Sequence, residues 1–215
     1  MLNNTNQDKK IITIGIVAIF LGIVLLSSNY LQEKKDKAFE TINFDLFKDN
    51  ISEVEDNSLS MNETLQGEVE HKKIEKKSDY TTYYIGYIEI PKIHLKKGFV
   101  DKKSRQNNVE QNVTIVNPSS YPNIEKGNFI LAAHSGNGYV GYFRNLYQLK
   151  RGDKVYIQYE GIKYTYQIKD IYEQPKKGTI QIYRDRQKTV LTLITCTNNN
   201  DKTQTVYIAE QIEKK

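Results

Sequence analysis

The stretch KVYIQYEGIKYTYQIK, residues 154–169, decides the class of fold. Its apolar and aromatic side chains recur at every second position on both sides of Glu160-Gly161, as in a half-buried strand. A glycine at the second position of a two-residue turn supplies the positive φ that a tight hairpin needs. We therefore predict two antiparallel strands, over residues 154–159 and 162–173, joined by this turn.

Similar β-rich runs occur on both sides of this hairpin and end at turn residues. Further strands are predicted over 83–90, 112–116, 128–133, 189–196 and 203–212. Turn chemistry separates them, as in Lys-Arg-Gly-Asp at 150–153 and the Asn-rich run 198–201. Only residues 142–150 suit a short helix. Many short strands between turns predict an all-β barrel or sandwich over residues 80–215.

The composition limits the classes of function. The chain has 215 residues and a net charge of +5, which suits a protein beside an anionic envelope surface and does not by itself indicate nucleic acid. A single cysteine, Cys196, excludes an internal disulfide and a Cys-based zinc site. Its thiol is either an inert buried group or a reactive one. We expect no metal and no cofactor.

The N-terminal part differs in character from the rest. Residues 11–28 read IITIGIVAIFLGIVLLSS and carry no charge, which is long enough to cross a bilayer. A cleaved signal peptide has a shorter apolar core and an Ala-x-Ala-like site, so we favour an uncleaved anchor. Lysines flank both ends of the run, so the positive-inside rule does not settle its orientation.

These features predict four segments in a single-pass protein of the cell membrane. They are a cytoplasmic tail (1–10), a transmembrane anchor (11–29), a charged and partly helical linker (30–79) and an extracytoplasmic catalytic domain (80–215). The linker is rich in Glu and Lys, and its scattered apolar residues have partly helical spacing, although a solvated linker is the simpler interpretation.

Two residues that carry chemistry stand where predicted strands end. Cys196 closes the run TLITC before the Asn-rich loop, and His134 closes NFILAAH before Ser-Gly-Asn-Gly. Each alone is more often structural than reactive. Together they form a hypothesis, since an imidazole can shift a thiol toward thiolate and then protonate a leaving amine. His71, in the linker, and His94, near a strand end, have no comparable setting.

Two other patterns have simpler explanations. Residues 136–141 fit G-x-G-x-x-G, but no long crossover helix follows, so we interpret the glycines as shaping a cleft beside His134 and not as a dinucleotide site. The segment 175–188 holds five Lys and Arg residues. It is either a solvated basic loop or one wall of a substrate groove.

The order of the motifs resembles the sortase family. TLITC (192–196) is similar to the T-L-x-T-C signature, and NFILAAH (128–134) resembles the strand that carries the catalytic histidine. GYIEIP (86–91), FRNL (143–146) through Gly152-Asp153, and TVYIA (205–209) resemble the opening strand, the segment after the histidine and the closing strand. The likeness covers residues 80–213 in the expected order.

The resemblance implies an eight-stranded sortase-type β-barrel with short helices. It implies a cysteine transpeptidase that cleaves an LPxTG-like sorting motif of surface proteins through an acyl-enzyme on Cys196, with His134 as acid and base. The acceptor would be an amine of a cell-wall precursor or a pilin. The short 175–188 segment and the lack of an Asp-Pro-aromatic lid favour a class A or D type over class B or the pilin class C.

One position departs from the family pattern. Sortases usually carry an arginine on the closing strand opposite the cysteine, and here Gln204 stands at that place. Its amide can donate only a neutral hydrogen bond, which is weaker than a charge-assisted one. Lys202, or an arginine from elsewhere (Arg144, Arg184 or Arg186), is the alternative source of charge. Thr195, Ser135 and Arg184 are expected to contact substrate.

Two other functions remain open from the sequence. A hydrolytic cysteine peptidase would resolve the thioester with water. A non-catalytic barrel that binds sorting peptides or wall polymer would account for the missing arginine.

Overall fold

The computed structural model describes residues 4–59 and 83–215, and it divides into two compact units, residues 1–42 and 43–215. The part of the predicted linker at 60–79 lies outside the described residues, whereas residues 30–59 are helical throughout. Over residues 30–59 the linker is therefore more helical than the partly helical spacing of its apolar residues predicts.

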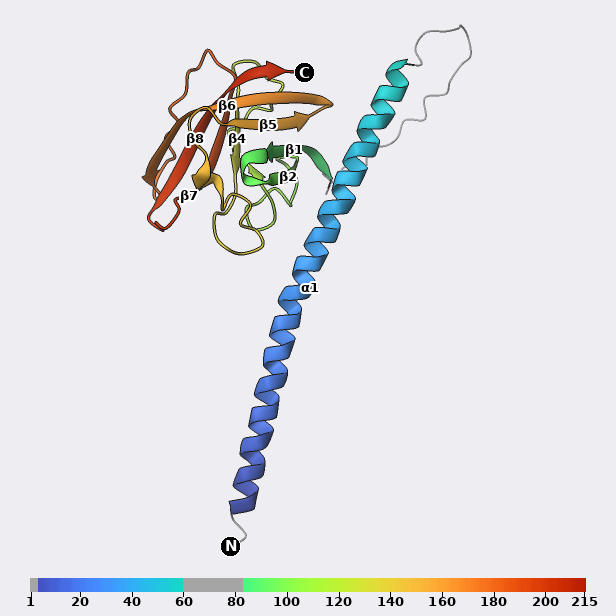
Figure 1. Ribbon diagram of the computed structural model, residues 1–215, viewed down its shortest axis with the longest axis vertical. Coiled ribbons are helices and arrows are strands. Elements are labelled where there is room, and N and C mark those ends of the chain that lie inside the picture. Colours follow the sequence, from blue (N-terminus) through green and yellow to red (C-terminus); the bar gives the residue numbers. More distant parts are fainter. Residues whose placement is uncertain (1–3, 60–82) are drawn as a thin grey trace. The chain divides into compact units, whose positions relative to one another are not determined.

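A single helix, α1 (Asn4–Leu59), forms the N-terminal part of the chain (Figure 1). Its large apolar side chains between Ile12 and Leu25 are exposed to solvent, with Ile14 and Phe20 at 68% and 67%. No helix within the described residues is both long enough and apolar enough to cross a membrane. The anchor over residues 11–29 stays a prediction.

Residues 84–214 form one eight-stranded sheet that curls into a nearly closed barrel (Figure 1). The strand order is β2-β1-β5-β6-β8-β7-β4-β3. All neighbouring strands are antiparallel except β4 and β7. The strands are β1 (Tyr84–Ile90), β2 (Leu95–Val100), β3 (Thr114–Ile115), β4 (Asn128–Ala132), β5 (Lys154–Tyr159), β6 (Ile162–Pro175), β7 (Val190–Cys196) and β8 (Thr203–Lys214).

The all-β prediction is confirmed, with the 154–169 hairpin as its clearest element. β5 and β6 pair from Lys154↔Gln167 to Tyr159↔Ile162, with Glu160 and Gly161 at φ 50° and 75° in the turn. The sequence missed β2, because Lys96, Lys97 and Gly98 interrupt its apolar pattern. The helix predicted over 142–150 shrinks to a 3₁₀ turn, η2 (Leu146–Gln148), and a second turn, η1 (Pro91–Ile93), follows β1.

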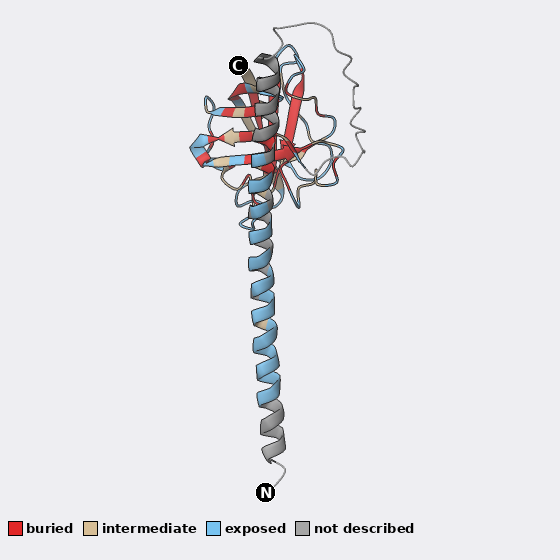
Figure 2. Cartoon of the chain, turned by 90° about the vertical axis from the view of Figure 1, so that its right-hand side faces the viewer, coloured by how far each residue is buried: buried red, intermediate tan, exposed pale blue. Residues whose placement is uncertain are grey.

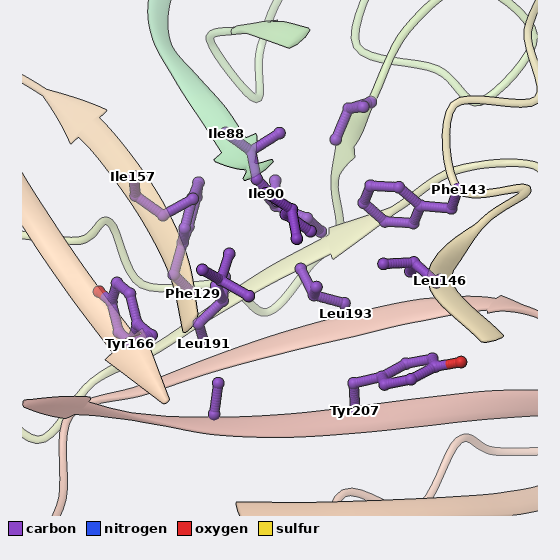
Figure 3. Packing of buried hydrophobic residues seen from close by; sticks show 14 of the residues in the cluster. Ile88, Ile90, Phe129, Phe143, Leu146, Ile157, Tyr166, Leu191, Leu193 and Tyr207 are labelled. Atoms are coloured by element: carbon purple, nitrogen blue, oxygen red, sulfur yellow. The ribbon is translucent and has the colours of Figure 1, made fainter. Parts of the chain in front are cut away.

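The barrel interior is a continuous apolar core. In Figure 2 the strands are mostly buried, whereas nearly all described residues of α1 between Ile12 and Leu31 are exposed. Figure 3 shows Phe129 of β4, Leu191 and Leu193 of β7, and Tyr207 of β8 within one cluster. Burial, with a smaller contribution from Glu173, raises the pKa of Tyr207 to about 12, so its phenol stays neutral at physiological pH. The core thus packs side chains of the adjacent strands β4, β7 and β8 into one cluster.

Truncation of a side chain in this cluster tests the packing. Leu193→Ala removes a fully buried side chain, and we expect the free energy of unfolding to fall by about 2–5 kcal/mol, the usual cost of a buried Leu→Ala change. Chemical denaturation followed by circular dichroism measures the loss. Ile124→Ala, in a loop at 51% exposure, is the control and should change stability by less than about 0.5 kcal/mol. Equal losses in both variants would contradict this packing.

Candidate active site

The parallel pairing of β4 with β7 brings the two candidate catalytic residues together. The register runs from Asn128↔Val190 to Ala132↔Ile194, and the amide of Ala133 still donates to the carbonyl of Ile194 at 3.3 Å. Two residues further along each strand, His134 comes level with Cys196. Adjacent strands lie about 4.8 Å apart, and side chains paired in register point to the same face. His134 and Cys196 therefore lie close to the ends of these two paired strands, and both line one pocket.

Buried side-chain hydrogen bonds fasten these two strands at both ends. Near the site, the Thr195 hydroxyl donates to the carbonyl of Ala133 at 2.8 Å. At the far end, the Thr192 hydroxyl donates to the Asn128 side-chain oxygen at 2.8 Å, and both residues are buried. The threonines of TLITC thus hold the strand that presents Cys196. Thr195, at 6% exposure, does not line the pocket described next.

A polar pocket of about 570 Å³ opens at the ends of these strands. Its walls are Cys196 at the end of β7 and residues from the three loops that follow β4 (134–137), β7 (197–201) and β6 (Lys176). Cys196 is a free, partly exposed thiol, and His134 stands in the same pocket. Ser135, which the sequence assigned to substrate contact, is in the wall as well. A thiol, an imidazole and an open, polar space suit nucleophilic attack on a peptide.

His134 is held by one contact to its ring and one to its backbone. Its Nε2 lies 3.1 Å from Oε1 of Glu110, and its carbonyl accepts a hydrogen bond from the amide of Phe143 at 2.9 Å. The Glu110 side chain is 75% exposed, so water weakens this contact and its contribution is small. Glu110 lies in the irregular segment between β2 and β3, and no periodic signal in the sequence could have identified it.

The glycine-rich segment 136–141 is a folded loop on one side of the pocket. A Cβ on Gly141 would lie 1.9 Å from the carbonyl oxygen of Gly136, so only glycine fits there. The Arg144 side chain donates to the carbonyls of Gly141, at 3.1 Å, and of Gly138. A three-residue turn follows in place of a long helix. The interpretation of these glycines as cleft-shaping, and not as a dinucleotide site, is consistent with this geometry.

Gln204 lies opposite Cys196, as the resemblance of the closing strand implies. Cys196 and Gln204 are paired across β7 and β8, so their side chains lie on the same face. The Gln204 amide, however, donates to the carbonyl of Pro175 at 3.4 Å, and Gln204 is not among the residues that line the pocket. It carries no charge at any pH of interest.

The arginines considered as substitutes are engaged elsewhere or lie outside the pocket. Arg144 holds the glycine-rich loop, and Arg184 donates to the carbonyls of Lys126 and Asp185. Arg186 is exposed, as is Lys202, and neither lines the pocket. Within the described residues, no group of three or more His, Cys, Asp and Glu side chains is arranged to hold a metal ion.

Comparisons with known proteins identify the family to which this arrangement belongs. A family model described as Sortase domain matches residues 88–212. Sortase A of Bacillus anthracis is 29% identical over 126 residues, which make up 58% of this chain and 58% of that protein. The chain therefore spans less than two thirds of that relative's length.

Solved structures share the fold. The Clostridium perfringens Sortase D5 transpeptidase matches 82% of this chain and 99% of its own at 23% identity, with a TM-score of 0.58. Sortase C1 of GBS Pilus Island 1 matches 60% of this chain and 64% of its own at 25% identity, with a TM-score of 0.54. These likenesses confirm the eight-stranded architecture expected from the motifs.

The contribution of Arg144 to holding the glycine-rich loop can be tested directly. Arg144→Leu removes both bonds to the glycine-rich loop, so we expect the amides of residues 136–142 to exchange with deuterium at least several-fold faster. Hydrogen–deuterium exchange mass spectrometry measures the rate. Arg151→Leu, which breaks an exposed pair with Asp170, is the matched control and should leave this loop unchanged. Protection at the wild-type level in Arg144→Leu would disprove the role.

Proposed function

We propose, because this chain belongs to the sortase family, that it is a cysteine transpeptidase of the cell envelope. In this proposal, it cleaves an LPxTG-like sorting motif of surface proteins and transfers the acyl part to an envelope amine. The observation that carries the proposal is the meeting of His134 and Cys196 in one polar pocket at the ends of a parallel strand pair.

In the first half-reaction, the Cys196 thiolate attacks the carbonyl carbon of the threonine in the motif. The C=O electron pair moves onto oxygen, and a tetrahedral oxyanion forms. When the oxyanion collapses, the C–N bond to glycine breaks and the leaving amine takes a proton from the His134 imidazolium. The product is a thioester on Cys196 and a free glycine amine.

In the second half-reaction, an acceptor amine replaces the glycine. The nitrogen of the acceptor amine attacks the thioester carbonyl while neutral His134 takes a proton from that amine. The C–S bond then breaks. A new amide forms, and the thiolate is restored. The lining residues 198–201 are exposed loop residues, so a second substrate can reach the pocket from solvent. We propose a cell-wall precursor or a pilin amine as this acceptor.

Substrate contacts are proposed on the loops around the thiol. Ser135, in the pocket wall, is placed to contact the motif. Arg184 lies on the β6–β7 connection, which would border the peptide further from Cys196. This connection is short and the sequence holds no Asp-Pro-aromatic lid, so we propose a class A or D type. Gln204 is the proposed third residue opposite Cys196.

Variants of the two central residues test the proposal. Cys196→Ala should abolish cleavage of a fluorogenic LPxTG-like peptide, because no nucleophile remains. His134→Gln should lower kcat by at least about 10²-fold, the usual contribution of a general acid and base, while Cys196 can still be alkylated. His94→Gln, outside the pocket, is the control and should keep wild-type turnover. Unchanged cleavage by Cys196→Ala would refute the mechanism.

We further propose that the apolar stretch of α1 anchors the chain in the cell membrane, with the barrel outside. The exposed apolar side chains between Ile12 and Leu25 support this proposal, because such a surface is unfavourable in water. The full chain, expressed in cells, should sediment with membranes and resist alkaline carbonate. A variant that lacks residues 1–29 should be released. Release of the full chain by carbonate would contradict the anchor.

A further inference from the structure

We propose that Lys176 supplies the positive charge that stabilises the oxyanion on the substrate carbonyl. This inference rests on the proposed function and assigns a role in it to Lys176. The sequence placed Lys176 only in the basic segment 175–188, either a solvated loop or one wall of a substrate groove. Lys176 is the only lysine or arginine among the described residues that line the pocket. Donors that point at a developing oxyanion are among the largest contributions to catalysis of acyl transfer.

The sheet places the backbone of Lys176 beside the catalytic row. Gln174 of β6 pairs with Gln204 of β8, which in turn pairs with Cys196 of β7. Lys176 follows two residues later, just beyond the end of β6. Its amide donates to the carbonyl of Lys202 at 3.0 Å, so the connection that starts the β6–β7 loop is tied to the β7–β8 loop at the pocket rim.

Gln204 then has a supporting function. Its amide donates to the carbonyl of Pro175, the residue before Lys176, at 3.4 Å. This distance is long for a hydrogen bond, so the contact is weak, but it directs the Gln204 side chain toward β6. Gln204 is thus a positioning residue for the segment that bears the charge. Gln204, opposite Cys196, and Lys176, in the pocket wall, would together perform the role of the arginine that sortases usually carry on the closing strand.

A lysine is suited to this place because of its long, flexible stem and compact ammonium group. Lys176 is exposed, and no ion pair within 4.0 Å joins it to Asp201, the one carboxylate in the same wall. Its ammonium is therefore available to substrate. As the thiolate attacks, the ammonium donates a hydrogen bond to the carbonyl oxygen that gains charge. The proton stays on Lys176, and the bond weakens again when the C=O re-forms.

Matched lysine variants test the charge through turnover. We expect Lys176→Gln to lower kcat/KM for the peptide about 10²-fold, as loss of an oxyanion donor usually does. Lys176→Arg, which keeps the charge, should stay within about five-fold of wild type. Lys177→Gln, an exposed neighbour outside the pocket, is the control and should stay within about two-fold. Wild-type turnover by Lys176→Gln, or a Lys176→Arg variant as slow as Lys176→Gln, would overturn the proposal.

A second readout does not depend on peptide turnover. Anionic iodoacetate and neutral iodoacetamide both alkylate Cys196. A nearby ammonium attracts the anion and so raises the ratio of the iodoacetate rate to the iodoacetamide rate. We expect this ratio to fall several-fold in Lys176→Gln and to be unchanged in Lys177→Gln. An equal ratio in both variants would overturn the assignment of Lys176. If the wild-type chain cleaves no peptide but the ratio falls, the proposed function fails while the cation beside the thiol is established.

Discussion

The one parallel strand pair in the barrel, β4 with β7, is the constraint on which the site depends. In an antiparallel pair, the carboxyl end of one strand lies beside the amino end of the other. In a parallel pair, the two carboxyl ends lie beside each other. His134 and Cys196 each follow the carboxyl end of such a strand, so only this pairing brings them together. The register matters equally, because a shift by one residue would turn one of the two side chains to the other face.

Several buried interactions stabilise this strand pair. The hydroxyls of Thr192 and Thr195 cross from β7 to β4, and both donors are buried. Leu191 and Leu193 on the same strand enter the apolar core. The same short strand therefore serves two purposes, since Leu191 and Leu193 pack the barrel and the hydroxyls of Thr192 and Thr195 fix the register that presents the thiol. This explains in physical terms why a short motif before a cysteine carries so much information about function.

The sequence predicted what depends on local periodicity and missed what depends on irregular backbone. The 154–169 hairpin and the two strands that lead to His134 and Cys196 follow from alternation and turn residues, whereas the place of Gln204 opposite Cys196 was implied by the resemblance to sortases. β2 was missed because two lysines and a glycine hide its pattern. Glu110 and Lys176 reach the site from loops, where neither period nor turn chemistry fixes the direction of a side chain. The functions of such residues become visible only in three dimensions.

The central claim is that Cys196 carries the acyl group between donor and acceptor. Intact-mass spectrometry of the full chain, quenched during reaction with an LPxTG-like peptide, tests this claim most directly. The account predicts an added mass equal to the acyl fragment on Cys196, which disappears faster when an amine acceptor is added and then appears as the joined amide product. Loss of that mass to water at the same rate with and without amine would indicate a hydrolytic peptidase. Cleavage or binding of the peptide with no mass ever added to Cys196 would contradict the account.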